Sequence, residues 1–315
     1  MKKIAFIFPG QGSQSTGMGL DLYNNFEVSK NIYNMADDIL GRKISDICFL
    51  GDDENLKKTI NAQSAIVTTS IAALEAFKSE LPDMIPSACL GHSLGEYCAM
   101  YQSGAMDFEN TIKAIQKRSE LMDEATKTTK GTMAAILGSS IDVINDCLKQ
   151  ASSLGLAEIA NYNDPNQIVI TGEVEAINKA CELIKEKGAK RVVPLAVSGA
   201  FHSSLMENAS NKFVDFVEQL KINDAKIPVI TNVDAKFTTS ASDFREKMPL
   251  QIKSSVMWLQ SIQNAIESGI ETYIEFGNGK VLAGLNRKIS ADIKTYNVYD
   301  TESLKSVIEQ LTIGV

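Results

Sequence analysis

The feature that most constrains this chain is the segment Ala88-Cys89-Leu90-Gly91-His92-Ser93-Leu94-Gly95-Glu96-Tyr97. It contains Gly-x-Ser-x-Gly, a pattern typical of a nucleophile elbow, in which a strand turns sharply into a helix with a serine at the tip. Glycines at 91 and 95 leave the space beside Ser93 that side chains would fill. The apolar residues before the turn predict a short buried strand, and those after it predict a helix.

A reactive serine needs a base within hydrogen-bond distance, because its hydroxyl is a poor nucleophile at neutral pH. The chain has two histidines, His92 and His202. The side chain of His92 leaves the turn in a different direction from that of Ser93, so we expect it to pack beside the strand. His202 is therefore the predicted base. The alternatives are a glycine-rich turn with a merely solvated serine and a histidine that only packs or lies at the surface.

Composition excludes several classes of protein. The 315 residues carry a net charge of −8, which argues against a nucleic-acid surface. No apolar run is long enough to span a bilayer, and Pro9-Gly10 ends the first apolar run too early for a signal peptide. The five cysteines are scattered without a CxxC pair, so we expect reduced thiols in a cytoplasmic protein, with no disulfide frame and no metal site.

Strands and helices alternate along most of the chain, which predicts a mainly parallel sheet covered by helices. The expected strands are 4–8, 87–90, 227–231, 271–276 and 295–299, and the expected helices are 62–77, 94–101, 111–125, 205–220 and 281–289. Helical residues between 242 and 258 are expected to be interrupted at Pro249.

The middle of the chain has a different order. Strands are expected at 132–137, 156–161, 167–171 and 191–197, helices at 141–153 and 174–187, and a turn at 163–166. This β-α-β-β-α-β order is that of the split βαβ, or ferredoxin-like, motif. We therefore predict an α/β-hydrolase-like core from residues 1–127 and 198–315, and a ferredoxin-like subdomain from residues 128–197 that walls one side of the site.

Arg118 is a charged residue on the apolar face of its predicted helix. The apolar residues of 111–125 share one helical face, and Arg118 falls near the middle of that face. Its guanidinium cannot lose its charge, so it must find an anion or many acceptors. A ligand carboxylate suits the planar fork. An internal salt bridge to a buried acid, or extension of the side chain to the surface, is the alternative.

Five segments together carry a resemblance to a known family. They are Phe8-Pro9-Gly10-Gln11-Gly12-Ser13-Gln14, Gly91-His92-Ser93-Leu94-Gly95-Glu96-Tyr97, Arg118, Phe201-His202-Ser203 and Gly277-Asn278-Gly279-Lys280-Val281-Leu282. In this order the chain closely resembles, nearly end to end, the malonyl-CoA:acyl carrier protein transacylases of bacterial fatty acid synthesis.

The resemblance implies a role for each matching position. It implies that Ser93 is acylated by malonyl-CoA, that His202 is general base and acid, and that a main-chain carbonyl near Gln251 orients this histidine. It further implies an oxyanion hole at the N–H groups of Gln11 and Leu94, a malonyl carboxylate held by Arg118, and pocket residues Gln63, Asn163 and Gln251. It implies malonyl-CoA and phosphopantetheinylated acyl carrier protein as substrates. We expect no cofactor, metal, nucleic acid or membrane partner, and a monomer.

Three positions depart from the pattern of that family. Ser64 and Ser255 stand where proline is common, and Asn278 replaces the usual proline of the G-x-G-K-V-L turn. None is expected to touch a reacting atom, although Asn278 could alter the rim of the pocket.

Two other functions use the same residues. A serine hydrolase would suit the elbow equally, but it leaves Arg118 without a purpose. A non-catalytic docking module would keep the fold without forming an acyl adduct on Ser93. Because acyl carrier proteins are acidic, docking needs a basic patch, for which the candidates are Arg287 with Lys288, or Lys185, Lys187, Lys190 and Arg191. The alternative is that these residues are solvated helix faces.

Overall fold

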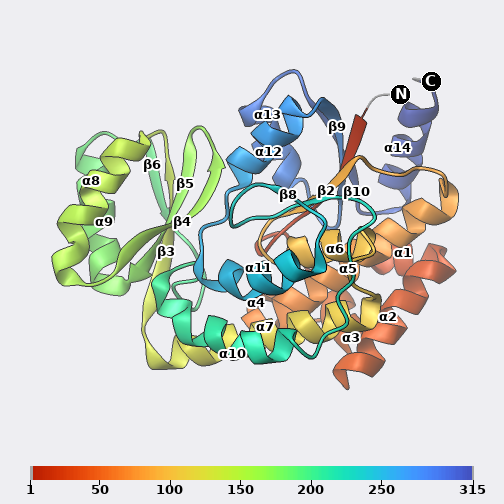
Figure 1. Ribbon diagram of the computed structural model, residues 1–315, viewed down its shortest axis with the longest axis horizontal. Helices are drawn as coiled ribbons and strands as arrows, with labels where there is room; N and C mark the ends of the chain where they lie inside the picture. Colours follow the sequence, from red (N-terminus) through yellow and green to blue (C-terminus); the bar gives the residue numbers. More distant parts are fainter. Residues whose placement is uncertain (1–2, 314–315) are drawn as a thin grey trace.

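The computed structural model describes residues 3–313, in which ten strands form two separate sheets (Figure 1). The larger sheet has six strands in the order β10-β9-β1-β2-β7-β8. Its strands are β1 (Lys3–Phe8), β2 (Ala88–Gly91), β7 (Val229–Ile230), β8 (Phe237–Thr238), β9 (Ile270–Phe276) and β10 (Lys294–Val298). Neighbours run parallel except β8, which is antiparallel to β7. The predicted α/β class with a mainly parallel sheet is confirmed.

The central strand β1 is buried on both faces. Phe6 and Phe8 pack with Phe276 of β9 on one face of the sheet, whereas Ala5 and Ile7 belong to the core on the other. Successive side chains of a strand point to opposite faces. A strand that is covered on both faces therefore needs a continuous apolar run, and that is why this segment shows no polar alternation.

Helices cover both faces of the six-stranded sheet. The core on one face includes residues from α2, α5, α6, α7 and α10, and the core on the other includes residues from α12 and α13. The helices around this sheet are α1 (Leu20–Asn25), α2 (Glu27–Leu40), α3 (Ile44–Phe49), α4 (Asp53–Lys57), α5 (Thr59–Glu80), α6 (Gly95–Gln102), α7 (Phe108–Thr128), α10 (Glu207–Val217), α11 (Ala241–Lys253), α12 (Trp258–Glu267), α13 (Val281–Ile289) and α14 (Thr301–Ile313). A short 3-10 helix, η2 (Ser204–Met206), precedes α10.

The smaller sheet, at the left of Figure 1 with α8 and α9, has four antiparallel strands in the order β4-β5-β3-β6. Its elements are β3 (Gly131–Leu137), α8 (Ile141–Ala151), η1 (Ser152–Leu154), β4 (Ala157–Asp164), β5 (Gln167–Glu173), α9 (Val174–Glu186) and β6 (Arg191–Pro194). The predicted β-α-β-β-α-β order is confirmed. Side chains from the strands and both helices form a separate apolar core.

Strand β4 joins the two parts of the molecule. On one side β4 pairs with β5. On its other side Asn161 forms a β-bridge with Val256, which lies between α11 and α12. The Val256 N–H donates to the Ala160 carbonyl (2.8 Å), and the Tyr162 N–H donates to the Val256 carbonyl (2.9 Å). The edge of the smaller sheet is thus hydrogen-bonded to the chain that carries the larger one.

Several predicted boundaries are wrong; β6, for example, ends at Pro194 and not at residue 197. Residues 163–164 were expected to form a turn, but β4 continues through them, because Asn163 and Asp164 find partners in His92 and Lys288. Pro249 was expected to interrupt a helix, yet α11 continues from Ala241 to Lys253.

A proline inside a helix removes a hydrogen bond and costs about 3 kcal/mol. In α11 this cost is offset by burial, since Phe244, Met248 and Ile252 lie on its buried face. The helix ends at Lys253 instead, and from Ser254 the chain extends to meet β4.

Within residues 3–313, none of the helices combines the length and the apolar character that crossing a bilayer requires.

Candidate active site

Ser93 lies in a tight turn between β2 and α6, as predicted. Its φ of 51° is in the left-handed region, which is uncommon for a residue with a side chain and indicates a strained turn. A Cβ on Gly91 would lie 1.9 Å from the carbonyl carbon of Gly95, and a Cβ on Gly95 would lie 2.3 Å from the Phe8 carbonyl oxygen. Both positions therefore require glycine so that β1, β2 and α6 can approach each other here.

The structure brings His202 to Ser93. The His202 Nε2 atom lies 2.7 Å from Ser93 Oγ. The other ring nitrogen, Nδ1, lies 2.9 Å from the Gln251 carbonyl oxygen and 3.1 Å from the Ser254 carbonyl oxygen. Carbonyl oxygens only accept, so Nδ1 carries the ring proton and the Nε2 lone pair accepts from the serine hydroxyl.

The imidazole is neutral. Burial is the main cause that lowers the pKa of His202 to about 3, and the positive charge of Arg118 lowers it further. The carbonyls of Gln251 and Ser254 act in the opposite direction, with a smaller effect. A neutral ring is the form that can take a proton from a hydroxyl, so at neutral pH the pair is ready for base-assisted attack.

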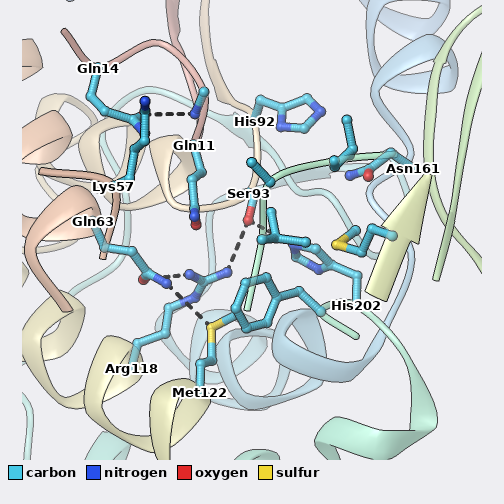
Figure 2. A pocket seen from close by; sticks show the side chains of 16 residues that line it. Gln11, Gln14, Lys57, Gln63, His92, Ser93, Arg118, Met122, Asn161 and His202 are labelled. Carbon is cyan, nitrogen blue, oxygen red and sulfur yellow. Dashed lines mark hydrogen bonds between the residues drawn. The ribbon is translucent and has the colours of Figure 1, made fainter. Parts of the chain in front are cut away.

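Arg118 extends from α7 to the same point and is 1% exposed. Figure 2 shows Ser93 between this guanidinium and the His202 ring. Its Nη1 donates to Gln63 Oε1 (2.6 Å), and its Nη2 donates to Ser93 Oγ (3.0 Å) and to Gln251 Oε1 (3.1 Å). Its Nε–H is buried without a hydrogen-bond partner in the described chain.

The surroundings of Arg118 exclude both alternatives for it. The side chain does not reach the surface, and no ion pair formed by residues 3–313 includes it. Burial lowers the pKa of Arg118, but a guanidinium remains protonated in proteins. The Tyr97 ring, 5.7 Å from the guanidinium carbon, adds a cation–π contact. The side chains that contact the guanidinium are all uncharged, and Glu96 acts to raise the pKa of Arg118 only from beyond ion-pair distance.

These side chains face a cavity of about 310 Å³ (Figure 2). Gln11 and Gln63 line it from the part of the chain that builds the larger sheet. Met133 and Asn161 line it from β3 and β4, and Leu195 follows β6. The smaller sheet therefore walls one side of the site.

Two backbone N–H groups predicted to act at the site, those of Gln11 and Leu94, make no hydrogen bond within the described chain. Gln11 follows β1, and Leu94 follows Ser93 at the end of β2. The two strands pair in parallel, and the His92 N–H donates to the Phe8 carbonyl at their ends (3.0 Å). The two loops thus leave the same edge of the sheet side by side.

Asn163 was expected to be a pocket residue, but it lies outside the cavity. It does not line the cavity, and its Oδ1 lies 2.9 Å from His92 Nε2. The His92 ring packs against Trp258, with ring centroids 5.8 Å apart. The asparagine that does line the cavity is Asn161, two residues earlier on β4.

Comparison with known proteins identifies the family. Residues 5–299 match the acyl transferase domain family. Over 312 residues the chain is 44% identical to the malonyl CoA-acyl carrier protein transacylase of Bacillus subtilis (strain 168), covering 99% of this chain and 98% of that one. The chain belongs to the malonyl CoA-acyl carrier protein transacylases.

Solved structures of this family have the same fold. An acyl carrier protein S-malonyltransferase from Vibrio cholerae has a TM-score of 0.93 at 35% identity, with 97% of this chain and 99% of that one covered. A malonyl-transacylase in complex with its type II PKS acyl-carrier protein has a TM-score of 0.94 at 35% identity, with coverages of 98% and 99%.

Several residues at the transacylase site were not predicted from the sequence. Asn161, Met122 and Met133 line the cavity, and Asn232 accepts a hydrogen bond from the Ser93 N–H (2.7 Å). The available signal for Asn232 was its position directly after the strand expected at 227–231, at the sheet edge where ligands bind in open α/β folds.

Three residues depart from the pattern of the transacylase family, and two of them form hydrogen bonds through their side chains. The Ser255 hydroxyl donates to the Ile159 carbonyl on β4. Asn278 Nδ2 donates to the Ser13 carbonyl (2.6 Å) and to Ser15 Oγ (3.0 Å), which ties its turn to the loop after β1. Ser64 is buried in α5, and nothing in the structure explains its hydroxyl.

Proposed function

We propose that this protein transfers the malonyl group of malonyl-CoA to the phosphopantetheine thiol of acyl carrier protein, for fatty acid synthesis. The observation that carries the proposal is a buried arginine, unpaired with any acid of residues 3–313, that lies 3.0 Å from a serine hydroxyl bonded to a neutral histidine. The curated relative at 44% identity is named for this activity.

In the first half-reaction the Ser93 oxygen attacks the thioester carbonyl while His202 Nε2 takes the hydroxyl proton. The N–H groups of Gln11 and Leu94, which have no partner in the described chain, are assigned to the oxyanion of the tetrahedral intermediate. Removing one such donor typically costs about 3 kcal/mol of transition-state stabilisation. The intermediate collapses by breaking the carbon–sulfur bond, and the His202 imidazolium returns its proton to the CoA thiolate.

The second half-reaction repeats these steps in reverse with a different thiol. His202 takes the proton of the phosphopantetheine thiol as its sulfur attacks the malonyl-serine carbonyl. Breaking the ester bond returns the proton to Ser93 Oγ. No step needs a resident metal or cofactor, and both acyl partners are substrates.

Arg118 is assigned to the free carboxylate of the malonyl group. Gln63 and Gln251 accept hydrogen bonds from it, and their amide oxygens are the groups that an incoming carboxylate replaces or joins. An acetyl group brings no carboxylate, so it leaves the buried charge without an anion. This difference selects malonyl-CoA over acetyl-CoA.

We also infer the architecture that carries these residues. The division is an α/β-hydrolase-like core from residues 1–127 and 198–315, of which the structure describes 3–127 and 198–313, and a ferredoxin-like insert from residues 128–197. The strand order of the smaller sheet and its separate apolar core support this division.

The test is mass spectrometry of the intact protein after mixing with malonyl-CoA. The wild type should gain one malonyl group on Ser93, lose it when phosphopantetheinylated carrier protein is added, and gain far less from acetyl-CoA. Ser93→Ala should gain nothing. Rapid release of CoA without a carrier would indicate a hydrolase, and absence of the adduct would indicate a docking module.

A further inference from the structure

Glu96 is a buried acid that the proposed reaction does not use. It lies on the first turn of α6, three residues after Ser93, and is 2% exposed. Acidic side chains are rarely buried unless they are paired, yet no ion pair formed by the described residues includes Glu96. Its Oε2 atom accepts the backbone N–H of Asn232 at 2.6 Å.

Asn232 follows β7 and uses every polar group that it has. Its N–H donates to Glu96, and its carbonyl accepts from the Met257 N–H (3.0 Å). Its side-chain Oδ1 accepts from the Ser93 N–H (2.7 Å), and its Nδ2 donates to the Gly91 carbonyl (2.7 Å). The side chain therefore bridges the last residue of β2 and the serine of the elbow.

Asparagine suits this position because one side of its amide accepts and the other donates. Aspartate would lose the donor to Gly91 and would add a second buried carboxyl group close to Glu96. The bridge spans the residues where the chain turns, and Ser93 itself has a φ of 51°. A strained conformation persists only where surrounding contacts hold it.

We propose that Glu96 and Asn232 are positioning residues for Ser93: Glu96 fixes the backbone of Asn232, and the Asn232 side chain holds the elbow in the conformation that aims the serine oxygen at the substrate. Neither residue lines the cavity that the acyl group would enter. The proposal rests on Ser93 as the nucleophile of the proposed function, and it adds a chain of contacts from α6 through the loop after β7 to the elbow.

The test compares acylation rates of Ser93 in four variants. Asn232→Ala should lower the single-turnover rate about 10- to 100-fold, the scale expected when a reacting group is misplaced by about 1 Å, while KM for malonyl-CoA changes less than about twofold. Glu96→Ala should lower the rate in the same way. Because Glu96 acts through Asn232, the double variant should lose no more than Asn232→Ala alone. Glu96→Gln keeps an acceptor oxygen and should recover most of the rate.

A matched control separates positioning from general loss of stability. Glu275 is also buried, and it also accepts backbone N–H groups, those of Leu282 (3.0 Å) and Ala283 (2.9 Å), but it lies on β9 away from the elbow contacts. Glu275→Ala, the same substitution as Glu96→Ala, should lower the midpoint of thermal unfolding and leave the acylation rate unchanged.

A second readout uses a fluorophosphonate that labels activated serines. If the wild type is labelled by it but not by malonyl-CoA, the proposed function fails, and the labelling rates of the variants still test the positioning role. Wild-type rates in folded Asn232→Ala, or multiplying losses in the double variant, would overturn the inference. If Asn232→Ala does not fold, Asn232→Asp replaces it, and an undiminished rate there would overturn the inference too.

Discussion

The two sheets contribute differently to the site. The larger sheet presents its contributions at one edge, since Gln11, Ser93 and Asn232 follow the parallel strands β1, β2 and β7. The smaller, antiparallel sheet has no such common edge of loops. It offers the flank of β3 and β4, and through them Met133 and Asn161 line the cavity.

The difference follows from strand direction. Parallel strands bring their carboxyl ends together, so residues far apart in sequence meet there with backbone N–H groups still free. Antiparallel strands alternate their ends and present side chains on a face instead. We therefore expect variants at the edge of the larger sheet to slow the chemical step strongly. Variants on the smaller sheet should slow it less, because their side chains only support the reacting groups.

The largest effect should come from His202→Ala. Loss of the base should lower the rate of malonyl-Ser93 formation about 10³- to 10⁶-fold, as in other serine enzymes that lose theirs. Asn161→Ala, on the smaller sheet, should lower it less than about tenfold. Rapid mixing with malonyl-CoA followed by mass spectrometry measures both. Similar losses in the two variants would break the contrast between the sheets.

Arg118→Ala should separate two substrates. Without the guanidinium, malonyl transfer should fall about 10²- to 10⁴-fold, because a buried carboxylate loses a partner worth about 3–5 kcal/mol. Acetyl transfer should be kept or should rise, since the unpaired charge is gone. Initial rates with the two CoA thioesters measure this, with Arg118→Lys as a control that keeps the charge but loses the planar fork. Equal losses for both substrates would remove the assignment.

The pH profile should report the environment of His202. Because its pKa is lowered to about 3, the ring stays unprotonated and active at about pH 5, where an ordinary histidine with a pKa of about 6.5 would be largely charged. Arg118→Ala removes one of the causes of the lowering, so the pKa should rise and the acid limb should move to higher pH. kcat/KM for acetyl-CoA, measured across pH in both proteins, tests this. A limb near 6.5 in the wild type would contradict it.

A smaller effect is expected from Glu158 on β4. Its carboxylate accepts the Ser204 N–H (2.8 Å) and the Ser204 hydroxyl, two residues after His202. Glu158→Ala removes these hydrogen bonds, which together stabilise the His202 loop by about 1 kcal/mol. If the whole of this free energy is lost from the transition state, the acylation rate should fall about fivefold. Glu173→Ala is the matched control, because Glu173 accepts the Leu156 N–H (2.7 Å) next to the same sheet without touching the His202 loop. Equal rates in these two variants would show that β4 does not support the base.

The smallest effect concerns docking of the carrier. The candidate patch of Arg287 and Lys288 contains two different kinds of residue. Lys288 forms an ion pair with the buried Asp164 at 3.2 Å, whereas no ion pair formed by residues 3–313 includes Arg287. Arg287→Glu should raise the KM for the carrier about two- to fivefold and leave that for malonyl-CoA unchanged. Lys288→Ala should mainly lower the free energy of unfolding, by about 1–3 kcal/mol, because Asp164 loses a partner. An unchanged carrier KM in Arg287→Glu would direct attention to Lys185, Lys187, Lys190 and Arg191.

Local patterns in the sequence predicted most elements, because side-chain periodicity depends on near neighbours. The elbow, the misplaced charge of Arg118 and the order of the smaller sheet all followed from such patterns. The errors arose where distant contacts outweighed them. Pro249 stays inside α11 because of the apolar face around it, and β4 extends through Asn163 because His92 offers a partner.

By itself, the sequence determined which residues were able to react: an elbow serine, one suitable histidine and an arginine on an apolar face. The tertiary structure alone decided how they meet. Ser93 is 139 positions from Asn232 and 109 positions from His202. The pairing of β2 with β7 brings Asn232 to Ser93, and the contacts of the His202 ring with the carbonyls of Gln251 and Ser254, at the end of α11, hold the histidine beside it. Strand order is set by long-range packing, which no window of neighbouring residues contains.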